Sequence, residues 1–236
     1  MYDQAALDRC LAFVNCQVQP SARSRMADDT LSRPRAVTIS RQAGCGAVVV
    51  AEGLARYLQA GGPAEAPPWT VFDRNLMEKV LEDHNLPARI ARFLPEDRTT
   101  QLHDIMGELF GVHPPSWTAI QQTAETILRL AELGRVILIG RGAHVVTARL
   151  ADMFHVRLVA PLEVRVEHAH EFYGMTKSKA REFCLREDRG RKRYLRRYYH
   201  VDVDDPLYYH LVINTSMVSY DDAARLIAEA AMTQPA

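Results

Sequence analysis

The first residues that could do chemistry stand in a short loop. Residues 37–39 are Val-Thr-Ile, glycines follow at 44 and 46, and an amphipathic segment extends from 47 to about 60. A strand, a glycine-containing loop and a helix in this order let backbone N–H groups and the positive end of the helix dipole meet one anion. We therefore predict a phosphate-binding loop, the alternative being a glycine-containing turn without a ligand. The residues assigned to phosphate binding are Ser40, Arg41, Gly44, Cys45, Gly46 and Ala47.

This loop matches only part of the Walker A pattern, G-x-x-x-x-G-K-[ST]. Gly46 takes the second glycine position, whereas Arg41 stands at the first. Ala47 replaces the lysine, and Val48 replaces the hydroxyl residue that binds Mg²⁺. One positioned charge is worth on the order of 3–4 kcal/mol, so the missing lysine predicts a rate lower by roughly a hundredfold or more, unless Arg41 or an arginine of a mobile lid replaces it.

A second chemical feature is an arginine between two glycines. Residues 136–139 form a continuous apolar run, which is typical of a strand buried on both faces of a parallel sheet. The run ends in Gly140-Arg141-Gly142. A planar guanidinium at the end of a central strand suits bidentate binding of a phosphate, and the alternative is an arginine that braces the loop by binding carbonyl groups.

Asp73 and Arg74 follow a shorter predicted strand, residues 69–72, and open a predicted helix at 75–82. An arginine at the carboxyl end of a parallel strand lies at the crevice where open α/β sheets bind ligands. Asp73 is explained equally well as the N-cap of the helix, a role that needs no substrate.

The strongest charge concentration lies in residues 177–197, where ten basic residues face three acidic ones. The resulting local charge of +7 concentrates repulsion that an anion would relieve. Two anions fit. One is a nucleic-acid backbone, with Tyr194, Tyr198 and Tyr199 as stacking surfaces, and the other is a triphosphate under a mobile lid of arginines.

Several segments, taken in order, resemble the cytidylate kinase-like family of P-loop nucleoside monophosphate kinases. They are VTISRQAGCG, VFDRNLMEKV, VILIGRGAHVV, VRLVAPLEVRV and EDRGRKRYLRRYYHVDVDDPLYYHLVINT. The resemblance extends from about residue 36 to about residue 231. Members of this family lack an orthodox Walker lysine and carry an arginine after the glycine-rich loop, and Val48 occupies that arginine position here.

The resemblance implies an α/β fold of the P-loop NTPase type, with three layers and a parallel sheet of about five strands. It implies a helical acceptor-binding insertion at about 74–135 and a lid at about 174–200. The implied activity is ATP-dependent phosphoryl transfer to a nucleoside monophosphate, CMP or a related small acceptor. ATP and Mg²⁺ are the implied cofactors, without a metal site made by the protein alone.

Roles for single residues also follow from the resemblance. It assigns Asp73 and Arg74 to the acceptor site and Arg141 to the acceptor's phosphate. It places Asn214, in the turn after a predicted strand at 211–213, near the base of the donor nucleotide.

For the basic segment at 177–197 we favour the mobile lid over nucleic-acid binding, because Asp188-x-x-Arg191-x-x-Tyr194 looks like the lid signature of the family. In that signature the arginine meets the transferring phosphates and the aspartate orients it. Arg189 and Arg193 are further candidates on the same segment.

The N-terminal segment, residues 1–35, lies outside the resemblance and precedes the kinase-like domain at 36–236. Residues 3–18 show helical periodicity, and residues 19–35 are rich in Pro, Ser and Arg, so we predict an amphipathic helix and a flexible linker. The helix packs either on its own domain or on a second subunit, which would form a homodimer.

Composition sets the cellular context. The 236 residues carry a formal net charge of zero, which predicts no general attraction to nucleic acid or membrane surfaces. Four cysteines, at 10, 16, 45 and 184, show no metal-ligand or disulfide spacing, and no apolar run approaches the ~20 residues of a membrane span. We therefore expect a cytoplasmic location. The Cys45 thiol could have a lowered pKa at a helix N-terminus, but we favour a space-filling role.

Two rival functions stay open. Because Ala47 replaces the lysine, the protein could be a catalytically weak regulatory protein that keeps the nucleotide crevice. A nucleic-acid-binding module would require further basic residues on the same face as the 177–197 segment. The sequence does not name the acceptor, because fold-level similarity does not transfer substrate identity.

Overall fold

The structure, a computed structural model, describes residues 34–63, 66–73, 104–106, 109 and 118–233. The predicted N-terminal helix, the linker up to residue 33 and most of the acceptor-side insertion lie outside the described residues. Within them, one five-stranded sheet has the order β2-β3-β1-β4-β5, and every neighbouring pair is parallel. The strands are β1 Ala36–Arg41, β2 Thr70–Phe72, β3 Val136–Ile139, β4 Met153–Val159 and β5 Leu211–Asn214.

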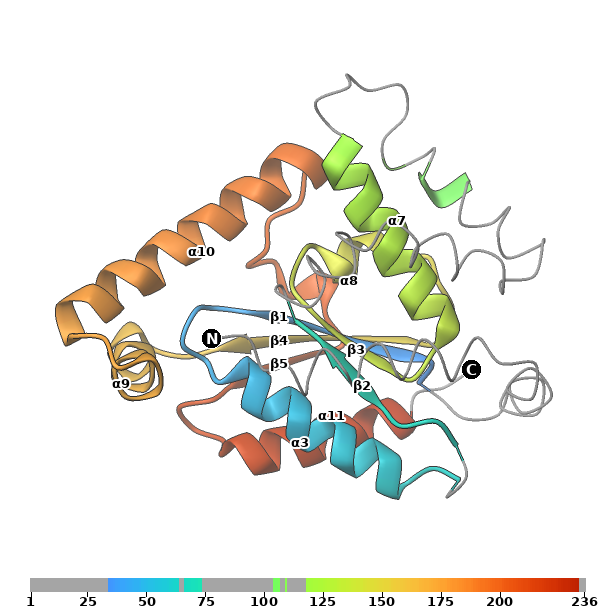
Figure 1. Cartoon of the computed structure of the whole chain (residues 1–236), viewed down its shortest axis with the longest axis horizontal. Helices are drawn as coiled ribbons and strands as arrows, with labels where there is room; N and C mark the ends of the chain where they lie inside the picture. Colours follow the sequence, from blue (N-terminus) through green and yellow to red (C-terminus); the bar gives the residue numbers. More distant parts are fainter. Residues whose placement is uncertain (1–33, 64–65, 74–103, 107–108, 110–117, 234–236) are drawn as a thin grey trace.

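Helices cover both faces of the sheet (Figure 1). Helices α3 (Ala47–Ala60) and α11 (Tyr220–Met232) pack together on one face, and α7 (Thr118–Leu133) and the short α8 (Ala143–Val146) cover the other. Val37 and Ile39 of β1 belong to the core under α3 and α11, whereas Ala36 belongs to the core under α7. Such alternation of buried side chains is typical of a central parallel strand. The prediction of a three-layer fold of the P-loop NTPase type is confirmed.

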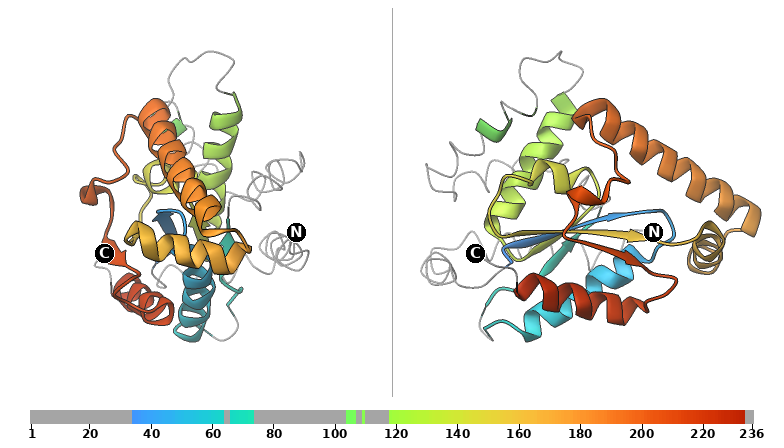
Figure 2. Two further views of the ribbon diagram at one scale, coloured as in Figure 1. Left: turned by 90° about the vertical axis from the view of Figure 1, so that its left-hand side faces the viewer. Right: turned by 180° about the vertical axis from the view of Figure 1, so that it is seen from behind.

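Two further helices, α9 (Leu162–Tyr173) and α10 (Lys177–Tyr199), lie together at the end of the sheet where β1 leads into α3 (Figures 1 and 2). They share a small apolar cluster with Ala43 of the predicted phosphate-binding loop, separate from the two large cores. A short helix, η3 (Pro206–Tyr208), lies between α10 and β5. None of the described helices is long and apolar enough to cross a membrane.

Sheet register brings the predicted functional segments together. Ile39 of β1 pairs with Ile139 of β3 on one side and with Val156 of β4 on the other. The backbone N–H of Gly140 also donates to the carbonyl of Ile39 at 3.1 Å. The turn at 140–142 therefore lies directly beside the end of β1.

Candidate active site

The loop at 42–46 reaches α3 through two glycines in the left-handed region, Gly44 (φ 85°) and Gly46 (φ 69°). A Cβ on Gly44 would lie 2.4 Å from the carbonyl oxygen of Arg165, and one on Gly46 would lie 2.4 Å from the Tyr220 ring. Neither position accepts a side chain without movement of its neighbours. Helix α3 has no side-chain N-cap and no acidic residue in its first turn, so none of its own side chains offsets the positive end of its dipole.

Arg41, Arg141 and Arg191 converge beside this loop from three different elements. Arg41 ends β1, and its Nη1 atom would lie 1.9 Å from a Cβ on Gly140, so the guanidinium rests against that glycine. Burial, then Arg191 and, less strongly, Arg141 lower the pKa of Arg41 to about 10, whereas Asp73 raises that pKa. Cations gathered in this way repel one another, and a bound anion would relieve the repulsion.

The turn that carries Arg141 is strained. Gly140, Arg141 and Gly142 have φ angles of 83°, 55° and 74°, so all three lie in the left-handed region. That conformation costs a non-glycine residue roughly 1–2 kcal/mol and is found at ligand clamps. Arg141 lies close enough to Tyr194 and Tyr199 to counteract the burial that raises the pKa of each phenol.

Asp188 of the predicted lid pair contacts the loop directly. Asp188 Oδ1 accepts hydrogen bonds from Arg191 Nη2 at 2.7 Å and from the N–H of Ala43 at 2.8 Å. Asp188 Oδ2 accepts from Arg165 Nη1 at 2.6 Å. Asp188 therefore orients Arg191 and also occupies one N–H group of the loop.

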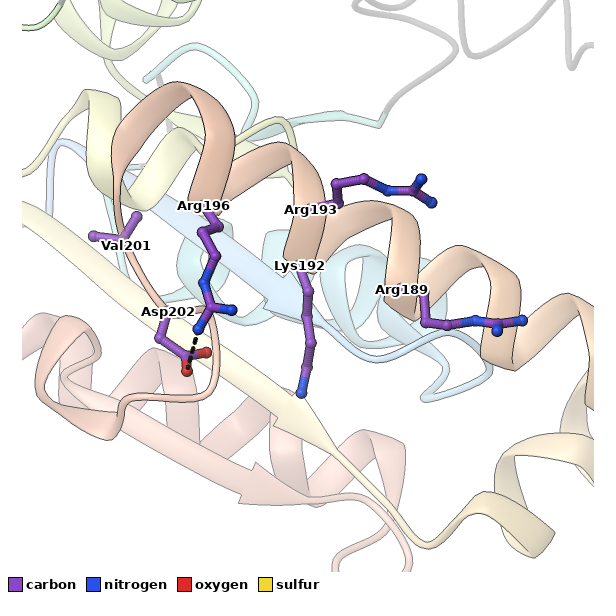
Figure 3. A pocket seen from close by; sticks show the side chains of 6 residues that line it. All are labelled: Arg189, Lys192, Arg193, Arg196, Val201 and Asp202. Carbon is purple, nitrogen blue, oxygen red and sulfur yellow. Dashed lines mark ion pairs between the residues drawn. The ribbon is translucent and has the colours of Figure 1, made fainter.

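Arg189 and Arg193 are not part of this group. They line a pocket of about 370 Å³ between α10 and the segment that follows it, shown in Figure 3. Figure 3 shows Arg196 directed at Asp202, 4.0 Å away, while Arg189 and Arg193 extend away from that pair. Every cation that lines the pocket comes from the 177–197 segment. The residues that line it are Arg189, Lys192, Arg193, Arg196, Val201 and Asp202.

Ser40 and Asn214 bind neighbouring protein groups. The Ser40 hydroxyl accepts from Arg157 Nη1 at 2.9 Å and from the Tyr209 hydroxyl at 3.2 Å, within a buried polar network. Asn214 Oδ1 accepts from the N–H of Ser216 at 3.0 Å and from its hydroxyl at 2.7 Å. Both side chains thus hold local structure here, and neither joins the converging arginines.

Cys45 and Ala47 fill space beside the loop. Burial raises the pKa of the Cys45 thiol to about 11, so the alternative of a lowered pKa is wrong. Ala47, where a Walker lysine would stand, begins α3 and is buried, and Val48 is exposed. Asp73 lies near Arg41, as its effect on the pKa of that residue requires, and Arg74 lies outside the described residues.

The sequence interpretation missed two residues of α9 that border the loop. Arg165 is buried on the same helix face as Leu162, Val166 and Ala169, so an arginine in an apolar helical pattern was the available signal. His168 lies against Gly44, where the backbone of that glycine raises the pKa of the imidazole and burial, the larger effect, lowers it.

His168 also begins an aromatic surface beside the loop. Its ring stacks on Phe172, with centroids 5.6 Å apart, and meets the edge of Tyr220 at 5.4 Å. The Phe172 side chain is 57% exposed. A flat, partly exposed aromatic surface next to a phosphate-binding loop has the shape and chemistry to stack a nucleotide base.

Comparison with known proteins agrees with the fold, which is an α/β fold of the P-loop NTPase type. The cytidylate kinase-like family matches residues 36–217, more than half of the chain. The chain therefore belongs to the cytidylate kinase-like family, a family of nucleotide kinases. Among the described residues, no group of three His, Cys, Asp or Glu side chains could hold a metal ion.

Individual relatives match only in part. A cytidylate kinase of Aeropyrum pernix is 31% identical over 106 residues, 44% of this chain and 60% of that protein. A cytidylate kinase of Staphylothermus marinus is 32% identical over 97 residues, 41% of this chain and 54% of that protein. A uronate isomerase of Corynebacterium glutamicum is 31% identical over 109 residues, 46% of this chain and 21% of that protein. The chain thus spans little more than half of either kinase.

One solved structure supports the fold. An uncharacterized protein of Eubacterium ventriosum superposes with a TM-score of 0.56 at 18% identity, covering 84% of this chain and 99% of that one. At this identity the similarity shows the fold alone.

Proposed function

We propose that this protein transfers a phosphoryl group from ATP to a nucleoside monophosphate such as CMP. The observation that carries the proposal is the convergence of Arg41, Arg141 and Arg191 beside a glycine loop at a helix N-terminus. Phosphoryl transfer needs alignment and positive charge around the moving group more than covalent chemistry. Membership of a nucleotide kinase family supports the same reaction.

The donor side is formed by the loop and the neighbouring helices. Because Asp188 binds the N–H of Ala43, the backbone from Gly44 to Ala47 is left to hold the β-phosphate, with the α3 dipole behind it. The exposed ring of Phe172, stacked on His168, is suited to the donor's base. Mg²⁺ enters as part of the MgATP substrate.

We assign the acceptor side to Asp73 and Arg141, and the sequence adds Arg74, which lies outside the described residues. The guanidinium of Arg141 would hold the acceptor's phosphate, whose oxygen is anionic at neutral pH and needs no general base. That oxygen attacks the γ-phosphorus of ATP, the bond from this phosphorus to the β–γ bridging oxygen breaks, and ADP leaves.

Arg41 offers the charge that the missing lysine would have supplied. Its guanidinium lies at the end of β1, between the loop and the Arg141 turn. Arg191, held by Asp188, reaches the same region from α10. Together they would stabilise the negative charge on the transferring group.

A turnover assay with MgATP and a panel of nucleoside monophosphates tests the proposal. We expect one acceptor to be preferred, and Arg141→Ala to lower kcat/KM about a hundredfold or more. Arg225→Ala is the matched control, because Arg225 is an exposed arginine on α11 that pairs with Asp222 and Glu229 on the same helix. Absence of turnover with every acceptor, combined with saturable ATP binding, would establish the regulatory alternative instead.

A further inference from the structure

One buried guanidinium joins three segments around the loop. The Arg165 side chain is 7% exposed. Its Nε donates to the carbonyl of Ala160 at 2.9 Å, and its Nη1 donates to the carbonyl of Ala43 at 3.1 Å and to Asp188 Oδ2 at 2.6 Å. A buried cation is stable only when its donors find partners, so these three contacts fix the end of β4, the loop and α10 relative to one another.

Ala43 is the point where these contacts meet. Its carbonyl accepts from Arg165 and its N–H donates to Asp188, so both of its backbone polar groups are bound. Its methyl group is buried in the apolar cluster of α9 and α10. The next residue, Gly44, packs against the backbone of Arg165 so closely that a Cβ would lie 2.4 Å from its carbonyl oxygen.

The same face of α10 carries the lid arginine. Cys184, Asp188 and Arg191 are spaced as neighbours on one helical face, and the thiol of Cys184 lies 3.8 Å from the carbonyl oxygen of Arg165. The position of Arg191 relative to the loop therefore depends on the contacts that Arg165 makes.

We propose that Arg165 is a positioning residue that ties the phosphate-binding loop to α10 through Ala43 and Asp188. It sets the shape of the loop and the place of Arg191 together, without touching the reacting atoms. Its effect on turnover rests on the proposed phosphoryl transfer, but the contact itself does not.

Hydrogen exchange at the Ala43 amide tests the contact without any need for activity. Arg165→Lys keeps the charge, but one ammonium group cannot reproduce the planar fork that reaches all three acceptors. We expect exchange of this amide in the nucleotide-free protein to accelerate about tenfold or more, and Asp188→Asn to accelerate it as well. Unchanged exchange in both variants would overturn the proposal.

Arg135→Lys is the matched control. Arg135 is as buried as Arg165, at 6% exposure, and it donates to Pro67 and Gln59 at the opposite end of the sheet. We expect this variant to lose stability as Arg165→Lys does, with the exchange of the Ala43 amide unchanged.

Kinetics provide the second measurement. We expect Arg165→Lys to lower kcat about tenfold or more with a smaller change in KM, and the double variant with Asp188→Asn to be no slower than the slower single variant. Equal losses of kcat in Arg165→Lys and Arg135→Lys would overturn the positioning role. If exchange accelerates in the variants but the protein shows no turnover, the inference about the Arg165 contact is supported and only the proposed function is rejected.

Discussion

Ser40 and Arg41 are neighbours at the end of β1, yet their side chains enter opposite surroundings because alternate residues of a strand face opposite sides of the sheet. Ser40 joins a buried network in which Arg157 pairs with Asp204 at 2.5 Å and the Tyr209 hydroxyl donates to Val203 at 2.8 Å.

Arg41 instead enters a region where cations gather, and burial, followed by the charge of Arg191, lowers its pKa to about 10. In the Ser40 network each charged or polar group faces a complementary one, whereas the surroundings of Arg41 leave positive charge in excess. The difference separates polar groups that stabilise the fold from polar groups suited to an anionic ligand.

The largest expected effect is on turnover. Arg41→Ala should lower kcat/KM about a hundredfold or more, because it removes the positive charge that stabilises the transferring phosphoryl group. Stability should change little, because the repulsion with Arg191 and Arg141 and the attraction to Asp73 disappear together. Steady-state kinetics and urea unfolding measure the two effects.

Ser40→Ala is the control at the adjacent position. It should lower stability, since Arg157 and Tyr209 lose a shared acceptor, while turnover changes little. If Arg41→Ala lost stability and kept its turnover, Arg41 would belong with the structural network.

The contrast between Ser40 and Arg41 shows which features of the structure the sequence could predict. Strong local patterns predicted β3 at 136–139 and α3 at 47–60 at the observed positions. The glycines on either side of Arg141 marked the turn at the end of β3, because their spacing is a local signal, whereas the positive φ of Arg141 is known only from the structure. The family pattern paired Asp188 with Arg191, three residues away on one helix, and the structure brings them within 2.7 Å.

Contacts between distant segments were not predictable in the same way. Ser40 was assigned to phosphate binding, but its observed partners, Arg157 and Tyr209, are 117 and 169 residues away. The contact of Asp188 with Ala43 likewise spans 145 residues. Such partners depend on sheet register and on helix packing, neither of which a local pattern contains.

A second prediction concerns acid stability and sharpens the same contrast. His144 contacts the Tyr209 hydroxyl at 3.3 Å, and His155 contacts the Thr38 hydroxyl at 2.8 Å, so both border the Ser40 side of β1. Burial, with a smaller effect of Arg157, lowers the pKa of His144 to about 4, and burial with nearby histidines lowers that of His155 to about 3.

In the unfolded chain these two histidines bind protons near pH 6.5, whereas in the folded protein their buried imidazoles do so only near pH 4 and below. The free energy of unfolding therefore falls as the pH drops from 6.5 toward 4. At pH 5.5 the loss is about 1.4 kcal/mol for each histidine. Urea unfolding at pH 7.5 and 5.5 measures it. His155→Gln should remove its own share of the pH dependence, about 1.4 kcal/mol, whereas Arg41→Ala should leave the pH dependence unchanged. A pH dependence that vanished in Arg41→Ala would place the titrating groups in the crevice.

The smallest expected effect comes from a single hydroxyl. Tyr209→Phe removes the hydroxyl that donates to the Val203 carbonyl at 2.8 Å and lies 3.2 Å from the Ser40 hydroxyl, but it keeps the ring under the Arg157 guanidinium, 5.7 Å from the ring centroid. We expect a loss of about 1 kcal/mol in the free energy of unfolding, the usual net value of a hydrogen bond. Turnover should stay within about twofold, because the hydroxyl lies on the Ser40 side of β1. A larger loss of turnover than of stability would mean that the two sides of β1 are coupled, and Ser40 would then return to the list of groups that act on the phosphates.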